Sequence, residues 1–477
     1  MGHNYNVDGK TGICGLIGDP VEHTLSPVIH NSLNELLEKN SVYVPFHVKN
    51  EGLEAAVKGA YELNITGMNV TVPHKNAVCQ LVTELDPAAE GIGAVNTLVR
   101  DEIKHGYRGF NTDMPGLLRA ITSDGISVAG NTVIIIGAGG ASKAVAYMCM
   151  QEQAEAIYVL NRTPEKAQEI AGHMNALFGE NRMHALPLSA YRQFCPDESE
   201  DNRQAYIVFQ CTSIGLSPNN DLTAIDDPEF YRCVKIGIDL IYNPANTRFM
   251  RYVKEAGGQA YNGLKMLLYQ GIIAYEYWND CKVSEEIAQE VYSRLYESVY
   301  PPSDNLVLIG FMGSGKTTIG RILEREYGYT MLDTDAYIEQ TAGKTIKEIF
   351  DHDGEDCFRK IETEVLQKLI TDTHHAVIST GGGMPLRPEN ARLLRQLGHV
   401  CYLRADEKTI WNRVKHDTSR PLLLCENPRE RIHSLMEERD PLYQKASHAQ
   451  IIVDRKKPEK LAQEIKNQVL SCKEDKV

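Results

Sequence analysis

The feature that most constrains the fold of this chain is one glycine-rich octapeptide, Gly310-Phe311-Met312-Gly313-Ser314-Gly315-Lys316-Thr317. An apolar run, 306–309, precedes it, and a segment with helical character, 319–324, follows it. Strand, glycine loop and helix in this order predict a phosphate-binding loop, because glycines let backbone N–H groups surround phosphate oxygens and a helix N-terminus favours an anion. Lys316 would reach the outer phosphates of a nucleoside triphosphate, and the Thr317 hydroxyl would bind Mg²⁺. The alternative is a plain turn between a strand and a helix.

Length and composition set broad limits. A chain of 477 residues with 42% hydrophobic and 24% charged residues predicts two or three globular domains. No apolar run is long enough to span a membrane, no hydrophobic leader begins the chain, and the eleven cysteines include no C-x-x-C pair. These features predict a cytoplasmic protein with reduced thiols. Residues 1–300 carry a net charge of −13 and residues 301–477 one of −1, which argues against binding to nucleic acid or to an anionic membrane.

Two hydroxyl side chains carry the first polar pattern of the chain. The apolar strand predicted at 12–17 leads to Thr24 and Ser26, which are separated by one residue and stand just before a helix. At that position they either bind a polar ligand at the helix entry or cap the helix. The two hydroxyls alone do not decide between these readings.

A second polar pattern follows in the strand predicted over 68–72. Because strand side chains alternate between faces, Asn69 and Thr71 are expected on the same face. Pro73 ends the strand, and Lys75 is expected at the entrance of the next helix. An amide, a hydroxyl and an amine that converge there would suit a polyhydroxylated substrate.

Two further motifs place amide and carboxyl side chains at expected strand ends, and they are Ala94-Val95-Asn96-Thr97 and Asn111-Thr112-Asp113. Either one alone would be interpreted as a turn. Together with the hydroxyl pair and the Asn-Val-Thr-x-Pro-x-Lys pattern, in this order, they resemble the shikimate dehydrogenase family. The resemblance implies that Lys75 and Asp113 form the catalytic pair. It also implies substrate contacts for Thr24, Ser26, Asn69, Thr71, Asn96, Tyr242 and Gln270.

The chemistry implied by this resemblance is the reduction of a ketone. The reaction needs a hydride on carbon and a proton on oxygen, and a positioned lysine can supply the proton. The sequence departs from the family pattern at two places. Thr24 replaces the commoner serine and adds a methyl group, and Met114-Pro115 follow Asp113 where glycine is usual. Both changes are expected to affect the shape of the substrate site.

The run 132–136 consists of β-branched residues and predicts a strand buried on both faces. It leads through a glycine-rich turn into a helix that reaches Met150. Strand, turn and helix form the first unit of a Rossmann domain, although Ser142 occupies the third glycine position of the usual fingerprint. The dinucleotide-binding turn is predicted to contain Gly137, Ala138, Gly139, Gly140 and Ala141.

The next predicted strand, 156–160, indicates which dinucleotide binds. It ends in Asn161-Arg162-Thr163, whereas an NAD enzyme would place an acidic residue there for the ribose 2′-hydroxyl. Arg162 and Lys166 instead suit a 2′-phosphate, and the alternative is a turn with solvated cations. NADP-dependent members of the resembled family carry the same Asn-Arg-Thr sequence, so NADP(H) is the predicted cofactor.

Later junctions between strands and loops fit the same nucleotide-binding edge of a sheet. By the resemblance, Thr212 and Leu240 lie near the nicotinamide and Tyr242 lies near the substrate. Gly263 opens a long helical segment, and Gln270 follows it by seven residues, as in the family. That helix is expected to return to the first domain.

The region after the phosphate-binding loop carries a second ordered set of motifs. A predicted strand over 329–335 ends in two carboxylates, Asp333 and Asp335, which share one face if the strand continues through both. The motifs are Asp333-Thr334-Asp335, Phe358-Arg359, Gly381-Gly382-Gly383, Arg420-Pro421-Leu422-Leu423 and Arg439. In this order they resemble the shikimate kinase family.

This second resemblance implies phosphoryl transfer from ATP to a hydroxyl of shikimate, with Mg²⁺ as the metal. Asp335 would hold the accepting hydroxyl, and Thr317 and Asp333 would serve the metal, partly through water. Arg359 and Arg439 would clamp the substrate carboxylate, because a planar guanidinium suits bidentate contact. The substrate site would comprise Asp335, Arg359, Gly381, Gly382, Gly383 and Arg439.

The resemblance also implies a mobile lid over 412–430. On this lid Arg420 would reach the transferring phosphate, and Arg413 would lie on or near the adenine. Surface salt bridges are the alternative role for each arginine. The ATP site would comprise Gly313, Ser314, Gly315, Lys316, Thr317, Thr318, Arg413 and Arg420.

Consecutive prolines in the segment 299–304 mark the expected linker. The fold class is α/β throughout. The expected domains are an α/β substrate domain at 1–114, completed by helices from about 262–298, a Rossmann NADP-binding domain at 115–261, and a P-loop kinase domain with a parallel sheet at 305–477.

Both resemblances together imply one bifunctional enzyme of aromatic amino-acid biosynthesis. It would reduce 3-dehydroshikimate to shikimate with NADPH and then phosphorylate the 3-hydroxyl to give shikimate 3-phosphate. The alternatives are a quinate/shikimate dehydrogenase fused to a related small-molecule kinase, and a metabolite-sensing regulator without activity. The regulator is disfavoured because the charged residues of both reactions are present. The sequence makes no prediction of oligomeric state.

Overall fold

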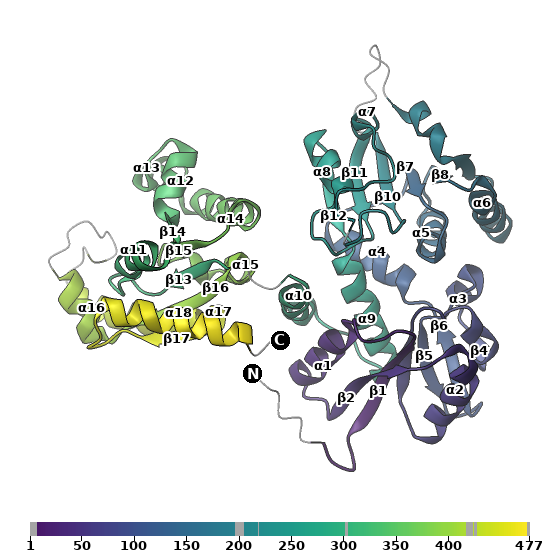
Figure 1. Ribbon diagram of the computed structural model, residues 1–477, viewed down its shortest axis with the longest axis horizontal. Coiled ribbons are helices and arrows are strands. Elements are labelled where there is room, and N and C mark those ends of the chain that lie inside the picture. Colours follow the sequence, from purple (N-terminus) through teal and green to yellow (C-terminus); the bar gives the residue numbers. More distant parts are fainter. Residues whose placement is uncertain are drawn as a thin grey trace. The chain divides into compact units, whose positions relative to one another are not determined.

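The computed structural model describes residues 7–195, 205–217, 219–300, 304–415, 423 and 427–474 (Figure 1). The chain divides into two compact units, residues 1–299 and 300–477. None of the described helices has the length and apolar character needed to cross a bilayer. The nine cysteines at positions 14–401 are all free thiols, as the scattered spacing predicted.

The first unit begins with a six-stranded sheet in the order β2-β1-β3-β5-β6-β4, which mixes parallel and antiparallel pairs. Its strands are β1 (Gly12–Gly18), β2 (Ser41–His47), β3 (Gly67–Val70), β4 (Glu84–Leu85), β5 (Thr97–Asp101) and β6 (Gly106–Phe110). The helices in this part are α1 (Ser26–Leu36), α2 (Leu53–Glu62) and α3 (Pro87–Ile92).

The second sheet of this unit is entirely parallel, in the order β12-β11-β10-β7-β8-β9. Its strands are β7 (Thr132–Ile136), β8 (Ala156–Asn161), β9 (Met183–Pro187), β10 (Tyr206–Gln210), β11 (Val234–Asp239) and β12 (Gln259–Asn262). Its helices are α5 (Gly140–Gln151), α6 (Pro164–Phe178), α7 (Pro228–Tyr231) and α8 (Arg248–Glu255). Val133 and Ile135 of β7 enter one hydrophobic core, and Ile134 and Ile136 enter another. The strand is therefore buried on both faces, as predicted.

Three helices complete the first unit, and they are α4 (Asp113–Ser123), α9 (Leu264–Asn279) and α10 (Glu285–Val299). Helix α9 packs against α4, α1 and β5. Near its end, the Trp278 indole N–H donates a hydrogen bond to the Leu98 carbonyl at 2.9 Å. The helix that follows the second sheet thus returns to the first one, and it carries Gln270 with it.

The second unit has one parallel five-stranded sheet in the order β14-β15-β13-β16-β17. Its strands are β13 (Leu306–Ile309), β14 (Thr330–Asp333), β15 (Ala376–Ser379), β16 (His399–Arg404) and β17 (Ala449–Ile452). Its helices are α11 (Lys316–Tyr327), α12 (Thr334–Ala342), α13 (Ile346–His352), α14 (Glu355–Asp372), α15 (Pro388–Leu397), α16 (Glu407–Val414), α17 (Pro428–Ala446) and α18 (Pro458–Glu474). Because β13 is central, the loop after it opens in the middle of the carboxyl edge of the sheet. The predicted α/β fold with parallel sheets is confirmed.

Three local expectations were wrong. Strand β14 ends at Asp333, whose carboxylate accepts a hydrogen bond from the Asp335 backbone N–H at 3.1 Å and so starts helix α12. Lys75 lies in a turn before a short 3₁₀ helix, η2 (Ala77–Gln80), instead of an α-helix. Asn96 precedes strand β5 and does not follow a strand.

Candidate active sites

A cavity of about 340 Å³ in the first unit is lined by residues of β1 and β3 and by residues that directly follow β11 and β12 of the second sheet. All nine residues predicted for substrate and catalysis in this part of the chain lie on its wall. They are Thr24, Ser26, Asn69, Thr71, Lys75, Asn96, Asp113, Tyr242 and Gln270. Residues more than 240 positions apart therefore meet at one site, although the motifs that predicted them are short and separate.

A charged pair, Lys75 and Asp113, lies on the wall of this cavity. Lys75 Nζ lies 2.6 Å from Asp113 Oδ2, and the two side chains are 29% and 20% exposed. The other oxygen of Asp113 accepts a hydrogen bond from the Asn96 amide at 2.9 Å. The carboxylate is thus held from two sides, and it fixes the ammonium where a proton can pass to a bound ketone oxygen.

The polar groups around this pair differ in how many of their hydrogen-bonding positions are already used within the protein. Thr24 Oγ1 lies 3.3 Å from Ser26 Oγ and accepts a 3.3 Å hydrogen bond from the Ser26 N–H at the start of α1. Thr24 therefore serves the helix entry while it also lines the cavity. Asn69, in contrast, is buried, and its amide is hydrogen-bonded within the protein.

The edge of the second sheet reaches the same cavity through Leu240 and Gly263. A Cβ atom on Gly263 would lie 2.1 Å from the Leu240 carbonyl oxygen. Only glycine allows this close approach, so helix α9 can start directly beside the end of β11. The predicted proton donor and the expected dinucleotide edge thus open into one space.

In the glycine-rich turn after β7, the structure shows why Ser142 can occupy the third glycine position of the Rossmann fingerprint. Ser142 is fully buried, and its hydroxyl accepts a hydrogen bond from the Gly139 N–H at 3.1 Å. A Cβ atom on Gly139 or Gly140 would meet no other atom within 4 Å. The outer side of the turn is therefore open, and backbone N–H groups at the start of α5 suit a pyrophosphate. Thr212 borders the turn, since its methyl group would lie 2.9 Å from a Cβ on Gly137.

The turn after β8 presents free positive charge. Arg162 and Lys166 are exposed, and within the described ranges neither forms an ion pair. The Asn161 amide donates to the Thr163 carbonyl at 2.8 Å and shapes this turn. Two such cations beside the end of a Rossmann strand fit a 2′-phosphate better than a ribose hydroxyl.

A buried polar pair organises the neighbouring strand ends. The Gln210 side chain accepts from the Thr212 N–H at 2.7 Å and lies 3.4 Å from Asp239. Asp239 is fully buried and accepts hydrogen bonds from the Thr247 hydroxyl at 2.6 Å and from the Ile241 N–H at 3.0 Å. None of the described cations pairs with it, and burial raises the pKa of Asp239 to about 6.

Asp239→Asn is therefore expected to change the pH dependence of stability. In the unfolded chain this carboxyl ionises near pH 4, so the native protein loses stability as the pH rises from about 4 through 6. The loss amounts to about 3 kcal/mol and is absent in the variant. Urea unfolding followed by tryptophan fluorescence measures it, since Trp411→Phe leaves Trp278 as the sole tryptophan. Asp221→Asn, at a 91% exposed side chain, is the control. Parallel pH profiles for Asp239→Asn and its parent would contradict this prediction.

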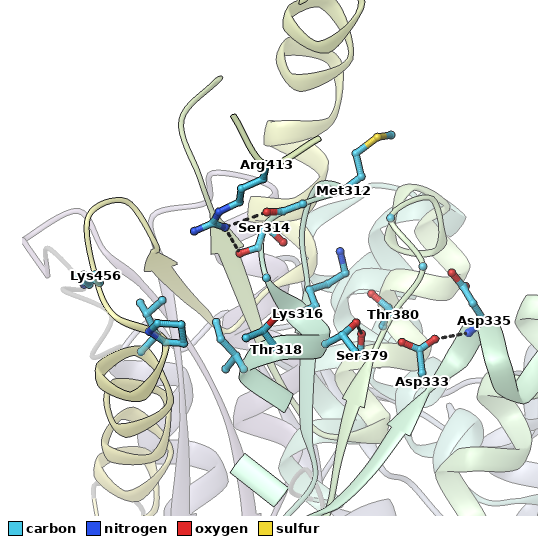
Figure 2. A pocket seen from close by; sticks show the side chains of 18 residues that line it. Met312, Ser314, Lys316, Thr318, Asp333, Asp335, Ser379, Thr380, Arg413 and Lys456 are labelled. Carbon is cyan, nitrogen blue, oxygen red and sulfur yellow. Dashed lines mark hydrogen bonds between the residues drawn. The ribbon is translucent and has the colours of Figure 1, made fainter. Parts of the chain in front are cut away.

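In the second unit, a cavity of about 530 Å³ lies over the phosphate-binding loop (Figure 2). Figure 2 shows Lys456 and Arg413 on one side of Lys316, and Asp333 and Asp335 on the other. The predicted residues on its wall are Gly313, Ser314, Gly315, Lys316, Thr317, Thr318, Asp333, Asp335, Gly381, Gly382 and Arg413. The nucleotide loop and the carboxylate pair thus share one cavity.

Two cationic side chains, Lys316 and Arg413, donate hydrogen bonds to backbone carbonyls of the phosphate-binding loop. Lys316 Nζ donates to the carbonyl oxygens of Gly310 at 2.8 Å and Phe311 at 3.2 Å. Arg413, on helix α16, donates to the carbonyls of Gly313 at 2.9 Å and Ser314 at 3.0 Å. Arg413 therefore borders the cavity next to the phosphate-binding loop.

The donor set at the cavity floor suits a magnesium ion. Thr317 Oγ1 lies 3.5 Å from Ser379 Oγ, and the Asp333 carboxylate is on the same wall. In the described residues no group of three or more His, Cys, Asp or Glu side chains could hold a metal. Mg²⁺ commonly uses one or two protein oxygens together with phosphate oxygens, so this small set fits it.

Asp335 is the carboxylate with an altered acidity. Burial raises the pKa of Asp335, the nearby Asp333 raises it further, and Lys316 and Arg359 oppose the shift. A Cβ atom on Gly381 would lie 2.5 Å from Asp335 Oδ1, so a larger residue there would displace this carboxylate. A raised pKa favours transient uptake of a proton from an attacking hydroxyl.

Arg359 approaches the glycine triplet, and Arg439, on another helix, lies beside Phe311 of the phosphate-binding loop. Arg359 donates to Glu362 at 2.8 Å and to Glu355 at 2.9 Å, and a Cβ on Gly383 would lie 2.9 Å from its guanidinium. The Arg439 guanidinium carbon lies 5.9 Å from the centre of the Phe311 ring, and its Nε is buried without a hydrogen-bond partner among the described residues. A buried guanidinium nitrogen of this kind fits an anionic ligand group. Arg420 and most of the expected lid lie outside the described residues.

Sequence reasoning missed several residues on the walls of both cavities. Lys456, in the loop after β17, and Pro458 and Leu461, at the start of α18, line the nucleotide cavity. Their signal was the Lys-Lys-Pro sequence directly after a strand, because parallel strands of one sheet end at the same edge. His23 and Met266 line the first cavity and carried no motif.

Comparison with protein families agrees with this geometry. Residues 16–98 match the model of the shikimate dehydrogenase substrate-binding domain, residues 119–197 match that of shikimate/quinate 5-dehydrogenase, and residues 312–470 match that of shikimate kinase. The shikimate dehydrogenases (NADP⁺) of Desulforamulus reducens and Methanopyrus kandleri are each 39% identical to this chain. The alignments cover 61% of this chain and 97% and 98% of the relatives.

Solved structures resemble the same part of the chain. Shikimate 5-dehydrogenase from Listeria monocytogenes, in complex with shikimate and NAD, is 30% identical with a TM-score of 0.55 over 60% of this chain and 98% of that one. The Thermus thermophilus enzyme, in complex with NADP(H) and shikimate, is 30% identical with a TM-score of 0.52. This match covers 60% of this chain and 100% of the Thermus chain. In its first 300 residues this chain belongs to the shikimate dehydrogenase family, and it continues into a shikimate kinase domain.

Proposed function

We propose that this chain is a bifunctional enzyme that reduces 3-dehydroshikimate to shikimate with NADPH and then phosphorylates the new hydroxyl with ATP. The observation that carries the proposal is the pair of cavities, one built around Lys75 and Asp113 and the other around Lys316 and Asp335. Each cavity holds the charged groups that its reaction requires.

In the first cavity, Lys75 donates the proton to the ketone oxygen, and Asp113 holds the ammonium in place. The cofactor supplies the hydride. Hydroxyl and amide groups around the pair orient the substrate ring, and Leu240 and Gly263 bring the cofactor edge to it. The substrate contacts are assigned to Thr24, Ser26, Thr71, Asn96, Tyr242 and Gln270. Asn69 lies on the same wall, and its amide is hydrogen-bonded within the protein instead of to the substrate.

NADP(H) would be held by the glycine turn and by the cations after β8. Gly139 and Gly140 leave space for the pyrophosphate, and Arg162 with Lys166 receives the 2′-phosphate. The assigned contacts are Gly137, Ala138, Gly139, Gly140, Ala141, Asn161, Arg162, Thr163, Lys166, Thr212, Leu240 and Gly263.

Arg162→Ala is expected to raise the KM for NADPH by about 10- to 100-fold, since a charge-assisted contact to the 2′-phosphate is lost. The KM for NADH, which lacks that phosphate, should stay within twofold. Steady-state kinetics with both cofactors measure this difference. Arg232→Ala, which removes an exposed arginine of the same domain, is the matched control. Equal losses with both cofactors would argue against the assignment.

The main alternative for the first cavity is a quinate/shikimate dehydrogenase. Turnover of quinate with NAD distinguishes the two. The proposed enzyme prefers shikimate with NADP over quinate with NAD, and the reverse preference would support the alternative.

In the second cavity, the phosphate-binding loop and Lys316 hold the nucleotide phosphates, and Thr317 with Asp333 would hold Mg²⁺, partly through water. The metal would neutralise phosphate charge. Asp335 orients the accepting hydroxyl and takes up its proton, and Arg359 with Arg439 binds the substrate carboxylate. Arg413 is assigned to the adenine side and Arg420 to the transferring phosphate.

The domain limits are also proposed here. The dehydrogenase substrate domain spans 1–114 and is completed by 262–298, the NADP-binding domain spans 115–261, a linker spans 299–304 and the kinase spans 305–477. The first limit falls inside helix α4, which begins at Asp113. The proposed function is tested by measuring NADPH oxidation with 3-dehydroshikimate and ADP formation with shikimate on the same purified chain.

A further inference from the structure

A buried polar cluster adjoins the wall of the dehydrogenase cavity, which Asn69 lines. It consists of His30 on α1, Tyr43 on β2 and Asn69 on β3, which are 1%, 2% and 4% exposed. The His30 and Tyr43 rings stack with centroids 4.2 Å apart and planes 11° apart. The Trp278 ring covers His30 at 5.0 Å. Of the three cluster residues, only Asn69 belongs to a motif with a predicted role in the reaction.

All four hydrogen-bonding positions of the Asn69 amide are used within the protein. Its oxygen accepts from the Tyr43 hydroxyl at 2.8 Å and from His30 Nε2 at 3.1 Å. Its nitrogen donates to the Asn96 carbonyl at 3.3 Å and to the Thr97 hydroxyl at 3.2 Å. A reversed amide would turn its nitrogen toward the His30 N–H and its oxygen toward a carbonyl oxygen. The cluster therefore permits one orientation.

His30 keeps its donor role at every pH at which the protein works. Burial lowers the pKa of His30 to about 3, so the ring stays neutral. Its Nδ1 is buried and meets no hydrogen-bond partner in the described part of the chain, which is consistent with a lone pair there and the proton on Nε2. The ring is thus a fixed donor to Asn69 and not an acid–base group.

Asn69 connects this cluster to the catalytic pair through Asn96. The Asn96 carbonyl receives the Asn69 amide, and its side-chain oxygen accepts the Thr112 N–H at 2.7 Å. The Asn96 side-chain nitrogen donates to Asp113 at 2.9 Å, and Asp113 pairs with Lys75 at 2.6 Å. One continuous chain of contacts thus runs from the buried rings to the proton donor.

We propose that Tyr43 and His30 are positioning residues for the reduction, which lock the Asn69 amide and through Asn96 hold Asp113 against Lys75. This inference rests on the proposed dehydrogenase function. It assigns Asn69 a positioning role in addition to its place on the cavity wall. A displaced carboxylate leaves the lysine free to move, and small misplacements of a catalytic group are costly.

Tyr43→Phe tests this role with a matched control in the same cluster. Tyr275 is also buried, its ring lies 6.3 Å from His30, and its hydroxyl has no hydrogen-bond partner within the described ranges. Tyr43→Phe should slow the turnover of saturating 3-dehydroshikimate about tenfold, as expected for one lost buried hydrogen bond. Tyr275→Phe should leave this turnover within twofold of the parent, and both variants should bind NADPH with unchanged affinity.

A double-mutant cycle separates positioning from a general structural effect. If Tyr43 acts through Asp113, adding Tyr43→Phe to an Asp113→Asn protein should change the residual turnover less than twofold. An additive tenfold loss in that background would overturn the proposal. So would equal turnover by Tyr43→Phe and Tyr275→Phe in a wild-type background.

His30 provides a second, independent variant pair. His30→Gln retains an N–H donor for Asn69, whereas His30→Leu has none. The glutamine variant should keep at least fivefold more activity than the leucine variant, and equal activities would count against the proposal. If the unaltered chain does not reduce 3-dehydroshikimate, the proposed function fails. If it does and the Tyr43 and His30 variants behave like their controls, only this inference fails.

Discussion

Lys75→Ala is expected to slow the reduction of 3-dehydroshikimate by about 10³-fold, because a positioned acid–base group contributes between about 10² and 10⁴ to a rate. Lys75 Nζ lies 2.6 Å from Asp113 in the substrate cavity, and no other lysine of the described ranges lines that cavity. NADPH oxidation at saturating substrate measures the effect. Shikimate-dependent ADP formation by the same protein should be unchanged, since the kinase residues belong to the other unit.

Lys58→Ala is the control for this variant. Lys58 lies in the same domain on helix α2, where it forms an exposed ion pair with Glu54. Both activities of the control should stay within twofold of the parent. A Lys75→Ala protein that retains more than a tenth of its reductase activity would refute the assigned role. A folded variant that loses both activities would refute the independence of the two sites.

Lys316→Ala is expected to slow kinase turnover by about 10³-fold while NADPH oxidation stays unchanged. Removal of one preorganised positive donor at a reacting phosphate has an effect of about this size. Lys316 stands at the first position of α11, directly after the glycine loop, and it lines the nucleotide cavity. A coupled assay of ADP formation with saturating shikimate and Mg-ATP measures the loss.

The control for the kinase site is Lys344→Ala, which breaks an exposed ion pair with Asp353 outside the cavity. It should preserve both activities. Kinase turnover by Lys316→Ala within tenfold of the parent would mean that this loop does not carry the nucleotide phosphates. The reciprocal pattern of the Lys75 and Lys316 variants distinguishes two active sites from one.

Much of this architecture was predictable where the local sequence alone determines structure. The run 132–136 and the run 376–379 form strands with these bounds, because continuous apolar residues leave no alternative to burial in a parallel sheet. The two glycine-rich loops could also be predicted, because each lies between such a strand and a helix.

What could not be predicted depends on contacts between distant elements. The strand before Asp335 ends early because the Asp333 carboxylate caps a helix, and a strand pattern does not reveal which carboxylate will do so. The Asn69 amide meets Tyr43 and His30 from two other elements, so its full occupancy follows only from the assembled sheet. Lys456 enters the nucleotide cavity because β17 joins the same sheet.

The most direct test follows one labelled molecule through both sites. The purified chain is given 3-dehydroshikimate, Mg-ATP and NADPH deuterated at the transferable position, and the products are identified by mass spectrometry. We predict a phosphate ester of shikimate that carries one deuterium on the phosphorylated carbon. Deuterated shikimate that is never phosphorylated, or unreduced 3-dehydroshikimate, would contradict the two-site function.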